Sequence, residues 1–143
     1  MTAATNQRFS ALSIAGSGKL DPKTNTLSIS YMGPSPIGSW TGASYTDLTG
    51  LIASGRIVSS SANAQTTLGI GELVGGIVTV KYTYKGDATL DGKLNIDDYV
   101  LIDSGISMGV AGWSNGDFNY DGKVNIDDYT ILDTTITDQG LPL

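Results

Sequence analysis

A 13-residue segment occurs twice in this chain and limits its possible folds more than any other feature. Residues 86–98 read Gly-Asp-Ala-Thr-Leu-Asp-Gly-Lys-Leu-Asn-Ile-Asp-Asp, and residues 116–128 read Gly-Asp-Phe-Asn-Tyr-Asp-Gly-Lys-Val-Asn-Ile-Asp-Asp. Over the longer alignment of residues 86–103 with 116–133, 11 of 18 positions are identical. Asp-Gly and Asn-rich segments are often simple solvated turns. A second copy with the same polar residues at the same positions argues against that interpretation.

Counted from the first Asp, each copy has oxygen-bearing side chains at positions 1, 3, 5, 9 and 12 and Gly at position 6. This is the pattern of the EF-hand calcium loop, in which Gly allows the sharp turn and the position-7 carbonyl also binds the ion. The expected ligands of the first loop are Asp87, Thr89, Asp91, the carbonyl of Lys93, Asn95 and Asp98. Those of the second are Asp117, Asn119, Asp121, the carbonyl of Lys123, Asn125 and Asp128. We predict two bound Ca²⁺ ions, the first held more weakly because the neutral hydroxyl of Thr89 replaces the usual Asp or Asn at position 3. A short β-bridge is expected between Leu94 and Val124, at position 8 of each loop.

The segments around the loops differ from those of an EF-hand. Residues 77–84 alternate with period 2 and predict a strand before the first loop, where an EF-hand has a helix. Helices are predicted after the loops, at 96–103 and 126–134, with Asn95 as an N-cap. Paired Asp-x-[Thr/Asn]-x-Asp-Gly-x-[Leu/Val]-Asn-x-x-Asp loops, each followed but not preceded by a helix, resemble the dockerin family over residues 86–137. The resemblance implies a non-catalytic module of secreted bacterial proteins that folds around two calcium ions and binds cohesin modules.

The same resemblance indicates where a partner would bind. Dockerins recognise cohesins at loop positions that correspond here to Ile96, Asp97, Ile126 and Asp127. Because both copies read Ile-Asp, the near-two-fold symmetry would allow binding in two orientations. Trp113, between the repeats, has two interpretations: a core residue between the helices, or a partner-binding anchor.

The first 85 residues predict a separate β-rich module. Alternation in residues 9–16 and 26–31, around a turn at 21–25, predicts an antiparallel hairpin. Its buried side chains would be Leu12, Ile14, Leu27, Ile29 and Tyr31. A helix is predicted within 44–55, residues 67–74 are ambiguous, and Trp40 is expected to anchor its loop on the sheet. This segment resembles those found before dockerin-like repeats in large bacterial surface proteins, which implies linkage to the repeat and no particular activity.

These elements predict an α+β fold class with two domains. Residues 1–85 would form a small β-rich N-terminal module of a hairpin, a helix and a strand. Residues 86–143 would form an all-α dockerin-like domain with two EF-hand-like calcium loops.

Composition argues against an enzyme. The chain has no Cys and no His, which removes disulfides, thiolate metal sites and the usual general base. Six of the 14 acidic residues are expected calcium ligands, and no nucleophile elbow, P-loop or dinucleotide fingerprint occurs. The N-terminus does not have the pattern of a signal peptide. Since the resemblance to dockerins implies a place outside the cell, where calcium is plentiful, we expect a mature or excised piece of an exported protein, at the cell surface or free outside the cell.

Charge is divided unevenly along the chain and suggests an alternative function. Residues 1–86 carry three acidic and six basic side chains, a net charge of +3, while residues 87–143 carry eleven and two, a net charge of −9. The acidic half of one copy could therefore bind the basic half of the next and build a filament or a surface layer, with help from an unpaired edge strand. Neither nucleic-acid binding nor membrane insertion is expected.

Overall fold

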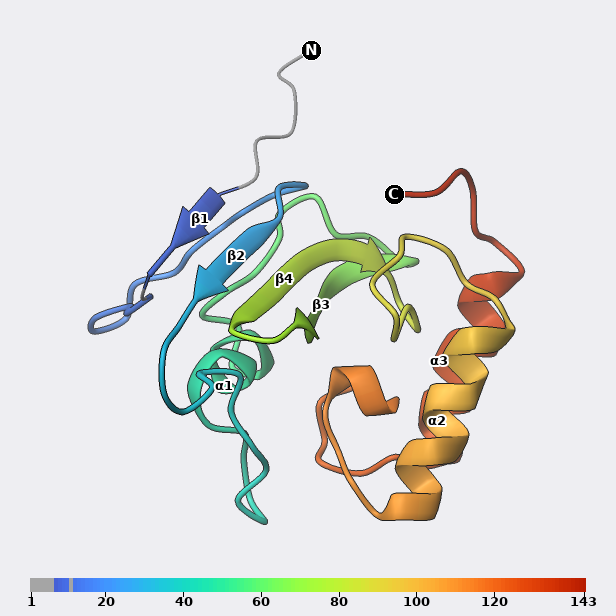
Figure 1. Cartoon of the computed structure of the whole chain (residues 1–143). Coiled ribbons are helices and arrows are strands. Elements are labelled where there is room, and N and C mark those ends of the chain that lie inside the picture. The colour runs from blue at the N-terminus through green and yellow to red at the C-terminus, as the bar shows by residue number, and fades with distance from the viewer. Residues whose placement is uncertain (1–6, 11) are drawn as a thin grey trace.

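A four-stranded sheet and two long helices are the main regular elements of the computed structural model, which describes residues 7–10 and 12–143 (Figure 1). The elements in chain order are β1 (Gln7–Phe9), β2 (Leu27–Ser30), α1 (Asp47–Ala53), β3 (Thr66–Val74), β4 (Ile77–Tyr84), α2 (Ile96–Met108), the 3-10 helix η1 (Trp113–Asn115) and α3 (Ile126–Ile136). The strand order is β1-β2-β4-β3. Strands β2, β4 and β3 pair antiparallel, and β1 adds to β2 in parallel.

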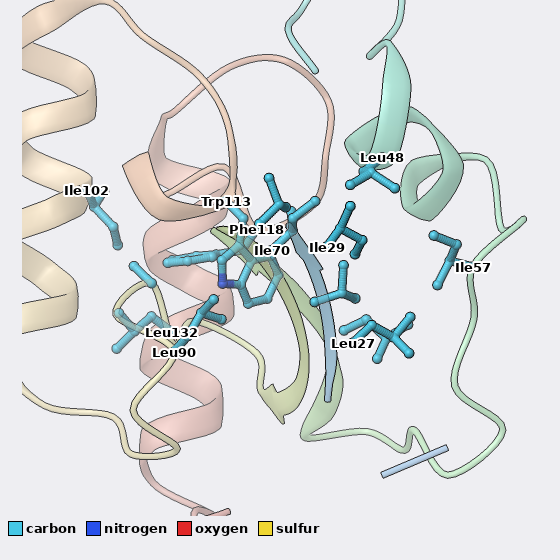
Figure 2. Close-up of a cluster of buried hydrophobic side chains, with 14 residues drawn as sticks. Leu27, Ile29, Leu48, Ile57, Ile70, Leu90, Ile102, Trp113, Phe118 and Leu132 are labelled. Carbon is cyan, nitrogen blue, oxygen red and sulfur yellow. The ribbon is translucent and has the colours of Figure 1, made fainter. Parts of the chain in front are cut away.

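The predicted fold class is wrong, because the helices do not form an all-α domain that follows a separate module. A single cluster of buried side chains contains residues of the sheet, of both calcium-type loops and of α2 and α3. Figure 2 shows Trp113 at its centre, beside Ile70 of the sheet and close to Leu90 and Leu132. The core therefore crosses the boundary predicted between residues 85 and 86. The physical reason is that two helices alone cannot surround a buried indole, whereas the sheet supplies the missing wall.

Two glycines in β3 let the helical half approach the sheet closely. A Cβ atom at Gly69 would lie 2.6 Å from both Leu90 Cδ2 and Trp113 Nε1, and one at Gly71 would lie 2.6 Å from Ser114 Oγ. The carbonyl groups of this strand also accept hydrogen bonds from the other half: Tyr120 Oη donates to Leu68 O at 2.8 Å. Residues 68–71 are buried in an unbroken run, which explains why segment 67–74 lacks the alternation of a half-exposed strand.

The predicted antiparallel hairpin is also wrong. The partner of β2 on this side is β1, and the pairing is parallel. Residues 12–20 leave the sheet and lie near Arg56, whose guanidinium donates to Gly18 O at 2.7 Å and to Ile14 O at 3.0 Å. Leu27 and Ile29 are buried as expected, whereas Leu12, Ile14 and Tyr31 are only partly buried. Ala11, within the predicted strand, lies outside the described residues.

Several local predictions are confirmed. Strand β4 has the predicted bounds of 77–84, and α1 lies within 44–55. Helix α2 continues past Asp103 to Met108 and includes Gly105. Glycine fits at this position because a Cβ atom there would lie only 2.0 Å from Asn115 O. Of the helices in the described part of the chain, none has the length and apolar character that a membrane span requires.

Candidate metal centre

The two loops have the same backbone conformation. The predicted left-handed turn at position 6 is present in both, with φ of 83° at Gly92 and 82° at Gly122. Position 4 is also left-handed, with φ of 59° at Leu90 and at Tyr120. Such a conformation costs a non-glycine residue roughly 1–2 kcal/mol. Both side chains pack into the shared core, so the conformation serves to attach each loop to the sheet.

In the first loop, side chains from both ends of the sequence pattern meet around Thr89. Its hydroxyl lies 3.1 Å from Asp87 Oδ1 and 3.2 Å from Asp98 Oδ1. The amide of Asp91 donates to Asp87 Oδ1 at 3.2 Å, and the amide of Gly92 donates to Asp87 Oδ2 at 2.8 Å. Positions 1, 3 and 12 therefore converge on one side of the loop.

The second loop repeats the backbone contacts of the first aspartate but not those of position 3. The amide of Asp121 donates to Asp117 Oδ1 at 3.1 Å, and the amide of Gly122 donates to Asp117 Oδ2 at 2.9 Å. The carboxylate of Asp128 accepts from the amide of Phe118 at 2.8 Å. Asn119 and Asp121 bond to each other, with Asn119 Nδ2 3.3 Å from Asp121 Oδ2.

Four aspartates, the first and last of each loop, are fully buried. They are Asp87, Asp98, Asp117 and Asp128. Burial is the largest influence on the pKa of Asp98, Asp117 and Asp128 and raises it in each. Neighbouring carboxylates add to this: Asp87 raises the pKa of Asp98, and Asp117 raises that of Asp128. Buried negative groups that repel one another are costly unless a cation compensates them.

The last ligand position of each loop is built into a helix N-terminus. Asn95 caps α2 by accepting from the amide of Asp97 at 2.8 Å, while Asp98 accepts from the amide of Asn95 at 3.0 Å. The corresponding residues of α3 form the same capping box. This confirms the predicted N-cap and fixes positions 9 and 12 relative to each other.

The donor chemistry of both loops fits a calcium ion. Carboxylate, hydroxyl, amide and carbonyl oxygens stand at the required positions, and no nitrogen or sulfur ligand competes with them. Within residues 7–10 and 12–143, no three His, Cys, Asp or Glu side chains gather into a metal-holding group. The three aspartates of each expected ligand set therefore do not form a ready-made carboxylate cluster in this structure. Five of the residues expected to bind calcium are exposed: Asp91, Asp121, Lys93, Lys123 and Asn119. Asn125 is half-buried.

The predicted β-bridge between Leu94 and Val124 is not formed. Among the described residues, the isolated bridges join Leu20 to Ile57 and Trp40 to Tyr45. Both backbone groups of Leu94 are instead bonded to the side chain of Gln139, each at 2.9 Å. The tail after α3 continues over the first loop, where Leu143 N donates to Gly92 O at 3.1 Å.

The predicted partner-binding residues fall into two groups. Ile96 and Ile126 are 70% and 72% exposed, and Asp97 and Asp127 beside them are also exposed. Trp113 is only 1% exposed, and its Nε1 donates to Asp87 O at 2.7 Å. Trp113 is therefore a core residue and not an exposed partner-binding anchor, and it contacts the sheet as well as the helices.

A pair of tyrosines joins α2 to α3 with near-two-fold symmetry. Tyr99 and Tyr129 stack with ring centroids 6.3 Å apart. The Tyr99 hydroxyl donates to Asp133 of α3, and the Tyr129 hydroxyl donates to Asp103 of α2. The two helices thus present equivalent residues on one surface.

Sequence reasoning missed two hydroxyl groups that contact the loops from outside. Thr83 of β4 donates to Asp87 Oδ2, and Tyr45 donates to Asp117 Oδ2. Trp40, expected on the sheet, instead covers Gly122, where a Cβ atom would come within 2.2 Å of its ring. Thr83 could have been noticed as a hydroxyl four residues before the loop; nothing in the sequence points from Tyr45 to Asp117.

Comparisons of this chain with family models, with curated proteins and with solved structures found no match.

Proposed function

We propose that this chain is a non-catalytic, extracellular or cell-surface module that binds two calcium ions and docks to a protein partner, in the manner of a dockerin with a cohesin-like partner. The observation that carries the proposal is the duplicated loop, with one backbone conformation at both sites and the same donor residues except at position 3, which is Thr89 in the first loop and Asn119 in the second. Calcium would neutralise the buried aspartates and hold the two ends of each loop together.

The docking surface would be the exposed face of the antiparallel α2–α3 pair, with Ile96 towards one end and Ile126 towards the other. Ile96 and Ile126 offer two exposed apolar contacts at equivalent positions, each next to an exposed aspartate. A complementary partner would present apolar side chains flanked by lysine, arginine or backbone amide donors. The residue equivalence of the two helices supports binding in two orientations.

A second candidate function is calcium-dependent self-assembly into a filament or surface layer. Exposed apolar residues also occur at the end of the β3–β4 hairpin, where Leu73 and Val74 are 56% and 62% exposed. Met32 is 99% exposed and follows Tyr31, whose amide donates to Gly76 O in this hairpin at 3.0 Å. This patch is on the front half of the chain, which carries the positive charge. Two unlike adhesive surfaces on one molecule favour head-to-tail contacts, which generate open assemblies.

Calorimetric titration and sedimentation velocity test the calcium claim and separate the two functions. The chelator-treated chain should bind two Ca²⁺ ions, and Asp91→Ala with Asp121→Ala should abolish this binding. A compact monomer in millimolar calcium that expands in chelator supports the docking module. Large assemblies that form only with calcium support self-assembly instead. Identical sedimentation with no heat of binding would contradict both candidates.

Paired variants test the docking face, with purified cohesin modules as the probe. Ile96→Asp or Ile126→Asp alone should leave binding through the other orientation, and the double variant should lose it. Leu73→Asp, at an exposed leucine of β3 outside both helices, is the matched control. A double variant that binds the cohesin module as the unmodified chain does would remove this face from the proposal.

A further inference from the structure

The first aspartates of the two calcium-type loops share three kinds of hydrogen-bond donor, and Asp87 also accepts from the Thr89 hydroxyl. Oδ1 accepts from the amide of the position-5 aspartate, at 3.2 Å in the first loop and 3.1 Å in the second. Oδ2 accepts from the amide of the position-6 glycine, at 2.8 Å and 2.9 Å. A hydroxyl group from outside the loop is the third donor, and it also binds Oδ2. The same oxygen of Asp87 and Asp117 is therefore held by neutral donors on the outer side of each loop.

The two outer hydroxyls come from different parts of the chain. In the first loop the donor is Thr83, four residues before Asp87. The residue four before Asp117 is Trp113, which has no hydroxyl and whose indole is bonded to Asp87 O in the core. Tyr45, 72 residues before Asp117, supplies the missing donor. The hydroxyl donor of the first loop thus comes from β4, the strand directly before it, whereas that of the second loop comes from the front half of the chain.

Tyr45 belongs to a segment that packs against the second loop. We call residues 38–46 the strap. The strap is closed by bonds between Ser39 and Thr46, with Thr46 N donating to Ser39 O at 3.0 Å and Ser39 N donating to the Thr46 hydroxyl at 3.0 Å. The ring of Trp40 packs edge-on to Tyr45, with centroids 5.1 Å apart.

The strap contacts three functional positions of the second loop. Tyr45 bonds to position 1, its ring meets Tyr120 at position 4 with centroids 6.3 Å apart, and Trp40 covers Gly122 at position 6. Because the strap is closed on itself, it presents these groups without needing calcium to order them first. Such preorganisation lowers the entropic cost of fixing the Asp117 carboxylate in the orientation that binds the ion.

We propose that Tyr45 is the outer hydrogen-bond partner that orients Asp117 as a calcium ligand, so that the strap sets the calcium affinity of the second loop. This inference rests on the proposed calcium binding. Outer partners of a ligating carboxylate orient it, and their loss typically weakens metal binding roughly 10- to 100-fold. By thermodynamic reciprocity, calcium in the second loop must stabilise the docked strap by the same factor.

Site-resolved titrations test the proposal. Asp91→Ala leaves the second loop as the intact site, and Asp121→Ala leaves the first. Tyr45→Phe should weaken calcium binding roughly 10- to 100-fold in the Asp91→Ala background and leave it unchanged in the Asp121→Ala background. Thr83→Val should show the reverse pattern. Tyr31→Phe is the matched control, because Tyr31 also donates to a carboxylate, that of Glu72, away from both loops.

Two further readouts separate positioning from simple structural support. Tyr45→Phe keeps the ring and its packing on Trp40 and removes one hydrogen bond to the buried Asp117. Its unfolding midpoint in chelator should therefore fall below that of the Tyr31→Phe control only by the loss of that bond, whereas the further stabilisation gained on calcium addition should shrink. Hydrogen exchange of strap amides should slow on calcium addition in the unmodified chain, and less so in Tyr45→Phe.

The possible outcomes separate the role of Tyr45 from calcium binding itself. Two calcium ions bound with unchanged affinity in Tyr45→Phe would overturn the role of Tyr45 and leave calcium binding intact. Equal weakening of both loops would show a general structural effect and would also overturn it. An unmodified chain that binds no calcium would overturn the proposed function and this inference together.

Discussion

The indole of Trp113 lies directly against Gly69, where a Cβ atom would come within 2.6 Å of Nε1 and 2.7 Å of Cε2. This contact joins the two halves of the chain, since Gly69 belongs to β3 and Trp113 begins η1. The close approach lets Trp113 Nε1 reach Asp87 O at 2.7 Å, and Asp87 is the first expected calcium ligand. Packing at the sheet is thereby linked to the geometry of the first loop.

Gly69→Ala should destabilise the protein by roughly 1–3 kcal/mol, because the added methyl group would overpack the Trp113 contact. Urea unfolding in calcium measures the change. Gly75→Ala is the matched control, since a Cβ atom at Gly75 meets nothing within 4 Å. Equal stability of the two variants would contradict the described packing.

Gln139→Ala should destabilise the protein by about 1–3 kcal/mol, because Leu94 is buried and would lose the partners of both its backbone groups. Hydrogen exchange at the Leu94 amide should become faster, and urea unfolding gives the free energy. Gln65→Ala is the control, since the hydrogen bonds at Gln65 involve its backbone. An unchanged Leu94 amide would mean that the tail does not secure the first loop.

Removing calcium should lower the thermal unfolding midpoint. At calcium concentrations about 100-fold above the dissociation constant, each site would add about 2.7 kcal/mol to the free energy of unfolding. Asp121→Ala should remove the contribution of the second site. Asp138→Ala removes the same charge from an exposed residue after α3 and should leave the calcium dependence intact. Scanning calorimetry with and without chelator makes the comparison.

The tyrosine pair between α2 and α3 predicts a dependence on alkaline pH. Burial, together with the bond to Asp133, raises the pKa of Tyr99 from 10.0 to about 12, and the bond to Asp103, together with burial, raises that of Tyr129 likewise. Since the folded state binds these protons more tightly, their contribution to stability is complete below pH 10.0 and is lost as the pH rises through about 12.

The variant carrying both Tyr99→Phe and Tyr129→Phe tests this dependence. Its free energy of unfolding should differ from that of the unmodified chain near neutral pH, and the difference should shrink between pH 10 and 12. Urea unfolding at a series of pH values provides the measurement. A difference that stays constant over this range would show that the phenol protons do not contribute.

Short-range features were predictable from the sequence because neighbouring residues encode them. The glycine turns at position 6, the Asn95 cap and the bounds of β4 each depend on residues within a few positions of one another. The left-handed conformation of Leu90 and Tyr120 was not predicted, because it depends on packing against the sheet. The end of α2 was placed too early for a similar reason: Gly105 normally ends a helix, but here it makes room for Asn115.

The amino-acid sequence by itself determined two equivalent loops with the donor set of a calcium site, each leading into a capped helix. Only the tertiary structure decided that a single core unites the loops with the sheet, that the strap covers the second loop, and that the tail covers the first. Tyr45 and Asp117 are 72 positions apart, and Leu94 and Gln139 are 45 apart. Sequence periodicity reports which face of an element is buried, but it holds no information about which distant segment covers that face.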